Sequence, residues 1–113
     1  MQLETDKDGY LTHLSDWNPD TAKWLAHSEG ITLEAEHWEV INALRAFYAD
    51  TGISPAMRIL VKIVKQKVSL EKGTSIHLLT LFPDSPAKLA AKIAGLPRPA
   101  NAFNSFLYLT RVA

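Results

Sequence analysis

Apolar residues recur at steps of three and four between residues 33 and 48, which is the repeat of an amphipathic helix. The apolar face consists of Leu33, His37, Val40, Ile41, Leu44, Phe47 and Tyr48. Thr32 stands where a capping residue is expected, and Gly52 follows the repeat. We therefore expect a helix over about residues 33–49, against whose apolar face the rest of the chain must pack.

Three other helix starts are marked by a capping residue followed by proline, a pair that suits the first turn of a helix. These pairs are Asn18-Pro19, Ser54-Pro55 and Ser85-Pro86. With a short helix before Pro83, they predict helices over about 19–28, 55–68, 75–81 and 86–94, and Gly95 ends the last one.

Asp6-Lys7-Asp8-Gly9 is a turn signal, and residues 2–5 and 10–13 are its expected short strands. The fold class that follows is mainly α. We expect a single-domain helical bundle with a small N-terminal β-hairpin, a helix-turn-helix-like corner and an extended C-terminal arm. A chain of 113 residues has room for one such core.

The charges are segregated along the chain although the formal net charge is zero. Residues 1–50 hold ten acids and three bases, a balance of 3 − 10 = −7, and residues 51–113 hold two acids and nine bases, or 9 − 2 = +7. Such asymmetry can mark a face for an anionic partner. We favour the alternative that the two halves attract each other within one fold.

The composition excludes several classes of site. The chain has no cysteine, so disulfides, thiolate metal sites and thiol nucleophiles are ruled out within these residues. Its four histidines have no metal-ligand spacing, and there is no phosphate loop, so we expect no metal and no cofactor. The polar N-terminus and the lack of a long apolar run predict a cytoplasmic protein that is not in a membrane.

Several large side chains are interpreted as core rather than as a site. His37 lies on the apolar face of its helix, which favours a hydrogen-bonded core histidine over a ligand or base. Trp17, Trp24 and Trp38 are likewise expected in the core rather than as a binding platform.

The two helices joined near Gly52 have the outline of a helix-turn-helix. Arg58, Lys62 and Lys65 form a basic stripe on the second helix and are a candidate face for an anionic partner. The second helix offers few polar side chains for reading bases, so we expect direct nucleic-acid binding less than simple packing.

The segment after the last helix is the expected arm. Gly95 and Leu96 are followed by Pro97, Arg98 and Pro99, and two prolines this close hold the chain extended. An arm of this kind usually presents something at its tip.

The sequence resembles the DsrC/TusE family of small sulfur-relay proteins. The matching landmarks, in order, are DKDGYL (6–11), Trp17, EGITLEAEHWEVI (29–41), RAFY (45–48), SPAMRILVK (54–62), EKGTS (71–75), LFPDSPAK (81–88) and KIAGLPRP (92–99). The tRNA-thiolation branch looks closer than the sulfite-reductase branch.

The resemblance implies a helical fold with a flexible C-terminal arm over residues 95–103. It implies a carrier whose cysteine at the arm tip takes persulfide sulfur from an upstream sulfurtransferase complex. That sulfur would pass to the enzyme that thiolates the wobble uridine of certain tRNAs.

The chain departs from the family at the residue that would carry the chemistry. The position of the persulfide cysteine holds Ala102, whose methyl group cannot bear a persulfide and is catalytically inactive. We expect residues 1–103 to form the family domain and residues 104–113, NSFLYLTRVA, to be an atypical apolar tail. A changed reading frame after Asn101 would explain both departures. The alternatives for the tail are packing on the body, binding to a partner, or adding a strand beside the hairpin.

Three functions stay open from the sequence. The first is a component of the sulfur relay toward tRNA 2-thiolation. The second is a cysteine-free paralogue that binds relay or sulfite-reductase partners as a regulator. The third is a helix-turn-helix nucleic-acid binder.

Overall fold

The structure is a computed structural model that describes residues 3–99. Its elements are a 3₁₀ helix η1 (Leu14–Asp16) and the helices α1 (Pro19–Ser28), α2 (Ala35–Thr51), α3 (Met57–Lys67), α4 (Ser75–Leu81) and α5 (Pro86–Ile93). The helical class and the order of the five helices are as predicted from the sequence.

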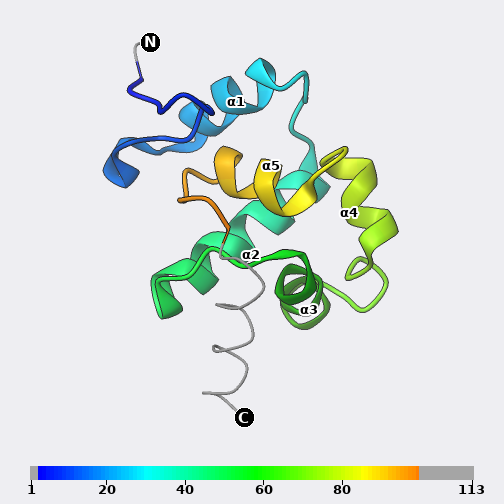
Figure 1. Cartoon of the computed structure of the whole chain (residues 1–113). Coiled ribbons are helices and arrows are strands. Elements are labelled where there is room, and N and C mark those ends of the chain that lie inside the picture. Colours follow the sequence, from blue (N-terminus) through cyan, green and yellow to red (C-terminus); the bar gives the residue numbers. More distant parts are fainter. Residues whose placement is uncertain (1–2, 100–113) are drawn as a thin grey trace.

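Helix α5 occupies the centre of the bundle. It packs against α1, α2, α3 and α4, and Figure 1 shows it lying between α1 and α2. Its buried side chains Ala90 and Ala91 are small, which lets neighbouring helices come close. Around them, Leu25, Ile41, Leu60 and other apolar side chains form a continuous core. The chain leaves this helix at the middle of the molecule, which places the start of the arm among several elements.

Helix α1 begins as expected, because Asn18 caps it by accepting the backbone N–H of Thr21 at 2.9 Å. Helix α2 begins two residues later than predicted, since Glu34 and not Thr32 is its N-cap. The Glu34 side chain accepts the backbone N–H of His37, and the His37 ring accepts the backbone N–H of Glu34. This reciprocal capping box involves a histidine in place of the usual glutamate.

Helix α3 also begins later than predicted. Ser54 does not cap it: both Ser54 and Pro55 are buried before the helix starts at Met57, and Ala56 is the N-cap. The Oγ of Ser54 has no hydrogen-bond partner among the described residues. The corner itself forms, since Ala43 of α2 packs on Ile59 and Ile63 of α3.

The predicted N-terminal β-hairpin is not confirmed in its strands, and residue 2 lies outside the described residues. No strand occurs within residues 3–99, and the segment makes a single antiparallel bridge between Thr5 and Leu11. The turn is present, with Gly9 at φ 91° and the Asp6 N–H bonded to the Tyr10 carbonyl at 2.8 Å. A further backbone bond joins the Thr12 N–H to the Glu4 carbonyl at 3.1 Å, and the chain then enters η1 at Leu14.

The two oppositely charged halves of the sequence attract each other, as expected. In the described part of the chain, every ion pair of a lysine or arginine joins a residue before position 51 to one after it. The pairs are Glu39–Lys72, Glu29–Lys92, Asp6–Arg98 and Asp8–Arg98.

The three tryptophans differ in burial. Trp17 and Trp38 are partly buried against the core, whereas Trp24 is 43% exposed, so the core prediction is wrong for Trp24. Its place on the helix turns it away from the buried face, which Leu25 and Ala26 occupy. No helix within residues 3–99 is long and apolar enough to cross a membrane.

Candidate functional site

The end of α5 is fixed by Trp17. The indole Nε1 of Trp17 donates to the carbonyl of Ile93 at 2.9 Å. Gly95 follows in the left-handed region, at φ 74°, where glycine is favoured. A Cβ at Gly95 would collide with the Trp17 ring. Glycine is therefore required here both by backbone conformation and by the close approach of the indole.

Arg45 of α2 completes this contact from the other side. Its guanidinium lies 3.8 Å from the centre of the Trp17 ring, and its Nη1 donates to the carbonyl of Ala94 at 2.6 Å. Burial lowers the pKa of Arg45, but an arginine stays charged at physiological pH. Two carbonyls at the end of α5 are thus satisfied by side chains from two remote segments. We call Ile93–Leu96 with Trp17 and Arg45 the arm base.

A second contact holds the chain three residues further on. The Nη1 of Arg98 lies 3.1 Å from Oδ2 of Asp6, and its Nη2 pairs with Asp8. The guanidinium also lies 4.9 Å from the centre of the Tyr10 ring. The hydrogen bond to Asp8 raises the pKa of Arg98. We call Arg98 with Asp6, Asp8 and Tyr10 the Arg98 latch.

A groove of about 960 Å³ opens beside the latch. Tyr10, Met57 and Leu89 contribute apolar surface to it, while Arg98 and Pro99 form part of its wall. Its charged lining residues are Asp8, Glu29, Asp84, Lys88, Lys92 and Arg98. The groove therefore borders the segment where the arm leaves the described structure.

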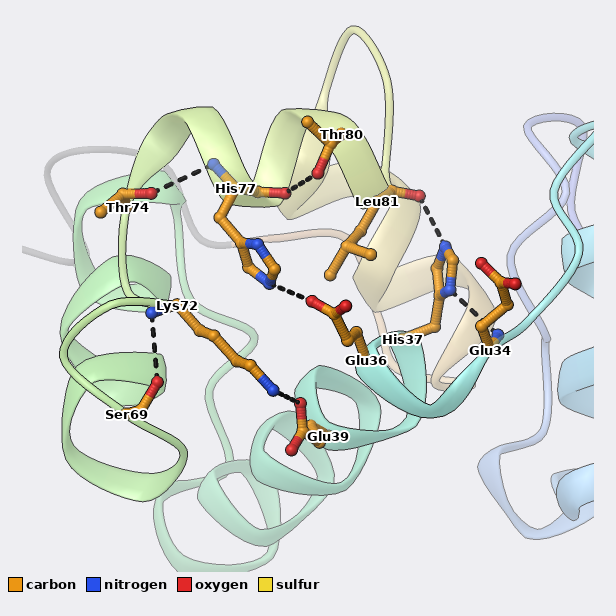
Figure 2. A network of polar contacts seen from close by, with 10 residues as sticks. All are labelled: Glu34, Glu36, His37, Glu39, Ser69, Lys72, Thr74, His77, Thr80 and Leu81. Atoms are coloured by element: carbon orange, nitrogen blue, oxygen red, sulfur yellow. Dashed lines mark hydrogen bonds and ion pairs between the residues drawn. The ribbon is translucent and has the colours of Figure 1, made fainter.

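A polar network on the opposite side of α2 holds α4 in place (Figure 2). Lys72 pairs with Glu39 at 2.8 Å, and Nε2 of His77 lies 3.2 Å from Oε2 of Glu36. The hydrogen bond with Glu39 raises the pKa of Lys72. No residue of the arm base or the latch belongs to this network, so we assign it a structural role.

His37 is the buried member of this network, as predicted. Its Nδ1 accepts the backbone N–H of Glu34, so the proton is on Nε2, which donates to the carbonyl of Leu81 at 2.9 Å. The ring also meets Phe82 edge-on, with centroids 5.3 Å apart. Within residues 3–99 no group of histidine and acidic side chains could hold a metal ion.

The predicted arm residues are only partly as expected. Residues 95–99 do not project: Gly95 is buried, Leu96 is 2% exposed, and Arg98 contacts the N-terminal turn. Pro97 is exposed. The prediction for Ala102 lies outside the described residues, as do those for the rest of the arm and for the 104–113 tail.

The basic stripe does not join this site. Arg58, Lys62 and Lys65 are all exposed on α3, and none of them forms an ion pair in the part of the chain that the structure describes. Their role as a face for an anionic partner stays a prediction.

Sequence reasoning missed the part that five residues have in the site. Asp6 and Asp8 were predicted as turn residues and Tyr10 as part of a strand. Trp17 was predicted in the core, and Arg45 was given no role of its own. A signal was nevertheless available: the landmarks DKDGYL, Trp17, RAFY and KIAGLPRP lie far apart in the chain. In the structure all four meet around the arm base and the latch.

Comparison with known proteins agrees with this geometry. The family described as "DsrC like protein" matches residues 1–103. "Sulfurtransferase TusE homolog" of Haemophilus influenzae is 51% identical over 100 residues, which cover 88% of this chain and 92% of that protein. "Sulfurtransferase TusE" of Escherichia coli is 50% identical over 98 residues, covering 87% and 90%.

Solved structures show the same fold. The NMR structure of Allochromatium vinosum DsrC superposes with a TM-score of 0.83 at 44% identity, covering 90% of this chain and 91% of that one. The oxidized gamma-subunit of the dissimilatory sulfite reductase (DsrC) from Archaeoglobus fulgidus gives a TM-score of 0.78 at 36% identity, covering 90% and 93%. With a family match across most of the chain and relatives about half identical, this chain belongs to the DsrC-like family.

Proposed function

We propose that this chain is a component of a sulfur relay that leads to 2-thiolation of the wobble uridine in tRNA. Relatives that are about half identical over most of its length are named sulfurtransferases. The observation that carries the proposal is the convergence of three distant landmarks, DKDGYL, Trp17 and RAFY, on residues 93–98 of the fourth. A fold that fixes the start of its arm from two sides is suited to presenting the end of that arm to partners.

Position 102 is the end that matters in this proposal. It is the third residue after Pro99, so the chain length limits its distance from Pro99 to at most about 11 Å. A group held on a short tether loses less entropy when a partner captures it than a group on a long free chain. The partners supported by the resemblance are an upstream sulfurtransferase complex and a tRNA-thiolating enzyme.

Ala102 divides this function into two parts. Binding of the relay partners needs the body and the arm, both of which are present. Covalent sulfur transfer needs a thiolate that attacks a persulfide and leaves with its outer sulfur, and a methyl group cannot do so. This chain therefore supplies the binding part, and a cysteine at position 102 would supply the rest.

The test is the variant Ala102→Cys, whose cysteine is unique in the chain. The variant is incubated with the persulfide form of the upstream sulfurtransferase complex, and its intact mass is measured. We expect a gain of one sulfur atom that a thiol reductant removes. The unchanged chain is the matched control and should gain nothing.

A folded Ala102→Cys protein whose thiol reacts with an alkylating reagent but never gains sulfur, either at full length or ended after Phe103, would overturn the proposal. The same variant ended after Phe103 separates the arm from the tail. Sulfur uptake by this shorter variant alone would show that residues 104–113 block the transfer.

The absence of cysteine favours a second candidate, a regulator that occupies relay partners without transferring sulfur. The unchanged chain should then form a complex with the upstream sulfurtransferase complex and slow its delivery of sulfur to the Ala102→Cys variant. If the unchanged chain binds nothing and slows nothing at high excess, this candidate is wrong.

A further inference from the structure

The Arg98 latch joins two segments that lie 90 residues apart. The three residues that contact Arg98 are Asp6, Asp8 and Tyr10, which are alternate residues of a single turn. The guanidinium pairs with two carboxylates and also lies over the Tyr10 ring, and arginine binds well to both kinds of group.

The turn is organised without help from the arm. The Oδ1 atom of Asp6 accepts the backbone N–H groups of Asp8 at 2.9 Å and Tyr10 at 3.1 Å. This leaves Oδ2 of Asp6 to face Arg98. Tyr10 is only 5% exposed, and its ring also lies 5.4 Å from the ammonium of Lys92 on α5. The contacts that form the turn at Asp6 and Tyr10 therefore do not depend on Arg98.

The arm base and the latch differ in burial. Leu96 is 2% exposed, whereas the side chains of Arg98 and Asp8 are each 51% exposed. Exposed ion pairs contribute little to stability, and salt screens them. Salt does not screen buried apolar contacts in this way. Pro97, which is exposed, lies between the two. We therefore expect the packing of Leu96 to persist when the ion pairs of Arg98 open.

We propose that Arg98 is a positioning residue: by closing on Asp6, Asp8 and Tyr10 it sets the direction in which the chain continues beyond Pro99. Opening the latch leaves the arm base in place and lets the chain pivot after Leu96. It also removes Arg98 and Pro99 from the wall of the groove described above, which widens that groove. The use of this pivot to present position 102 rests on the proposed function.

The test is ¹⁵N relaxation of the full chain, measured at the backbone amides of Leu96 and Arg98. In low salt we expect both amides to be rigid, with order parameters of about 0.85. In the variant Asp6→Asn/Asp8→Asn, the Arg98 amide should fall below about 0.6 while Leu96 is unchanged. The asparagine at position 6 keeps the oxygen that accepts the two turn N–H groups, so the turn is preserved.

Three further measurements test whether the loosening is specific to the latch. Asp50→Asn, which removes an exposed charge elsewhere, should change neither amide. Rising salt should loosen Arg98 in the unchanged chain and have no effect in the double variant. The exchange Asp8→Arg/Arg98→Asp should restore part of the rigidity that Asp8→Arg alone removes.

Two results would overturn the latch: an Arg98 amide that is equally rigid in all variants and salts, or loosening of Leu96 together with Arg98. These measurements involve no sulfur. Opening of the latch with no sulfur uptake by Ala102→Cys would therefore reject the proposed function alone, and uptake with unchanged relaxation would reject the latch alone.

Discussion

The indole of Trp17 lies so close to Gly95 that no other amino acid fits at the end of α5. The same indole bonds to the Ile93 carbonyl, so one side chain both requires the glycine and closes the helix beside it. Trp17 was expected to fill the core, and it does more than that: it determines where the arm begins.

Gly95→Ala should be strongly destabilising. A left-handed alanine costs about 1–2 kcal/mol, and forcing a methyl group against a packed ring costs about 1–3 kcal/mol. We expect a loss of about 2–5 kcal/mol in the free energy of unfolding, measured by urea denaturation. Gly52→Ala is the matched control, because Gly52 has φ 71° but nothing within 4 Å of a Cβ. If both variants lose the same free energy, the close approach of Trp17 has no energetic weight.

Arg45→Met should destabilise the arm base. The substitution keeps the apolar stem but removes the contact with the Trp17 face and the bond to the Ala94 carbonyl. We expect a loss of about 1–3 kcal/mol in unfolding free energy. Arg58→Met is the control, since Arg58 is exposed and outside the described ion pairs, and should change stability by no more than about 0.5 kcal/mol. Equal effects of the two variants would contradict the role given to Arg45.

The ionisation of Tyr10 should report the latch. Burial raises the pKa of Tyr10, Asp6 and Asp8 raise it further, and the positive charge of Arg98 acts in the opposite direction. Arg98→Gln should therefore raise the pKa of Tyr10, because the tyrosinate loses its cation. Asp8→Asn should lower it, because the tyrosinate loses a neighbouring anion. The NMR shift of the Tyr10 ring carbon that bears the oxygen, followed against pH, measures both.

Opposite shifts in these two variants are the expected result. The sign also fixes the effect on stability: a tyrosine whose pKa is raised on folding stabilises the protein below about pH 10, and this is lost as the pH rises through the folded value. Shifts in the same direction, or none, would mean that Arg98 and Asp8 are not both beside the ring in solution.

His37→Ala should cost far more than His77→Ala. Removal of His37 leaves the Leu81 carbonyl and the Glu34 N–H without a partner and leaves a hole beside Phe82, which should cost about 2–4 kcal/mol. His77 is partly exposed, and its loss should cost about 0.5–1 kcal/mol. Long-range ¹⁵N–¹H spectra should show His37 as the neutral tautomer protonated at Nε2. A proton on Nδ1 would contradict the capping box.

Much of the fold could be predicted from local chemistry. Asn18-Pro19 and Ser85-Pro86 placed the starts of α1 and α5, because caps and prolines act within a few residues. Ser54-Pro55 misled, since burial of both residues took precedence over capping and the helix starts at Met57. The hairpin was overpredicted for a related reason: a turn signal fixes the turn but not the length of the strands beside it.

The site was harder to predict because each of its contacts joins residues that are distant in the sequence. Nothing near Arg45 indicates that its guanidinium will stack on Trp17, and nothing near Asp6 indicates that its free oxygen will face Arg98. Such contacts follow from how the helices pack around α5. Only the family landmarks marked these residues in advance, and they did so without saying what the residues do.

The 90 residues between Asp8 and Arg98 also give the latch a place in time. Contacts between such distant residues form late in folding, because the entropy of closing so long a loop must first be offset by the contacts within it. The N-terminal turn is synthesised long before Arg98, and the two meet only when the helices between them have packed. A partner that touches the turn and the arm together therefore tests, in one encounter, whether the intervening chain is folded.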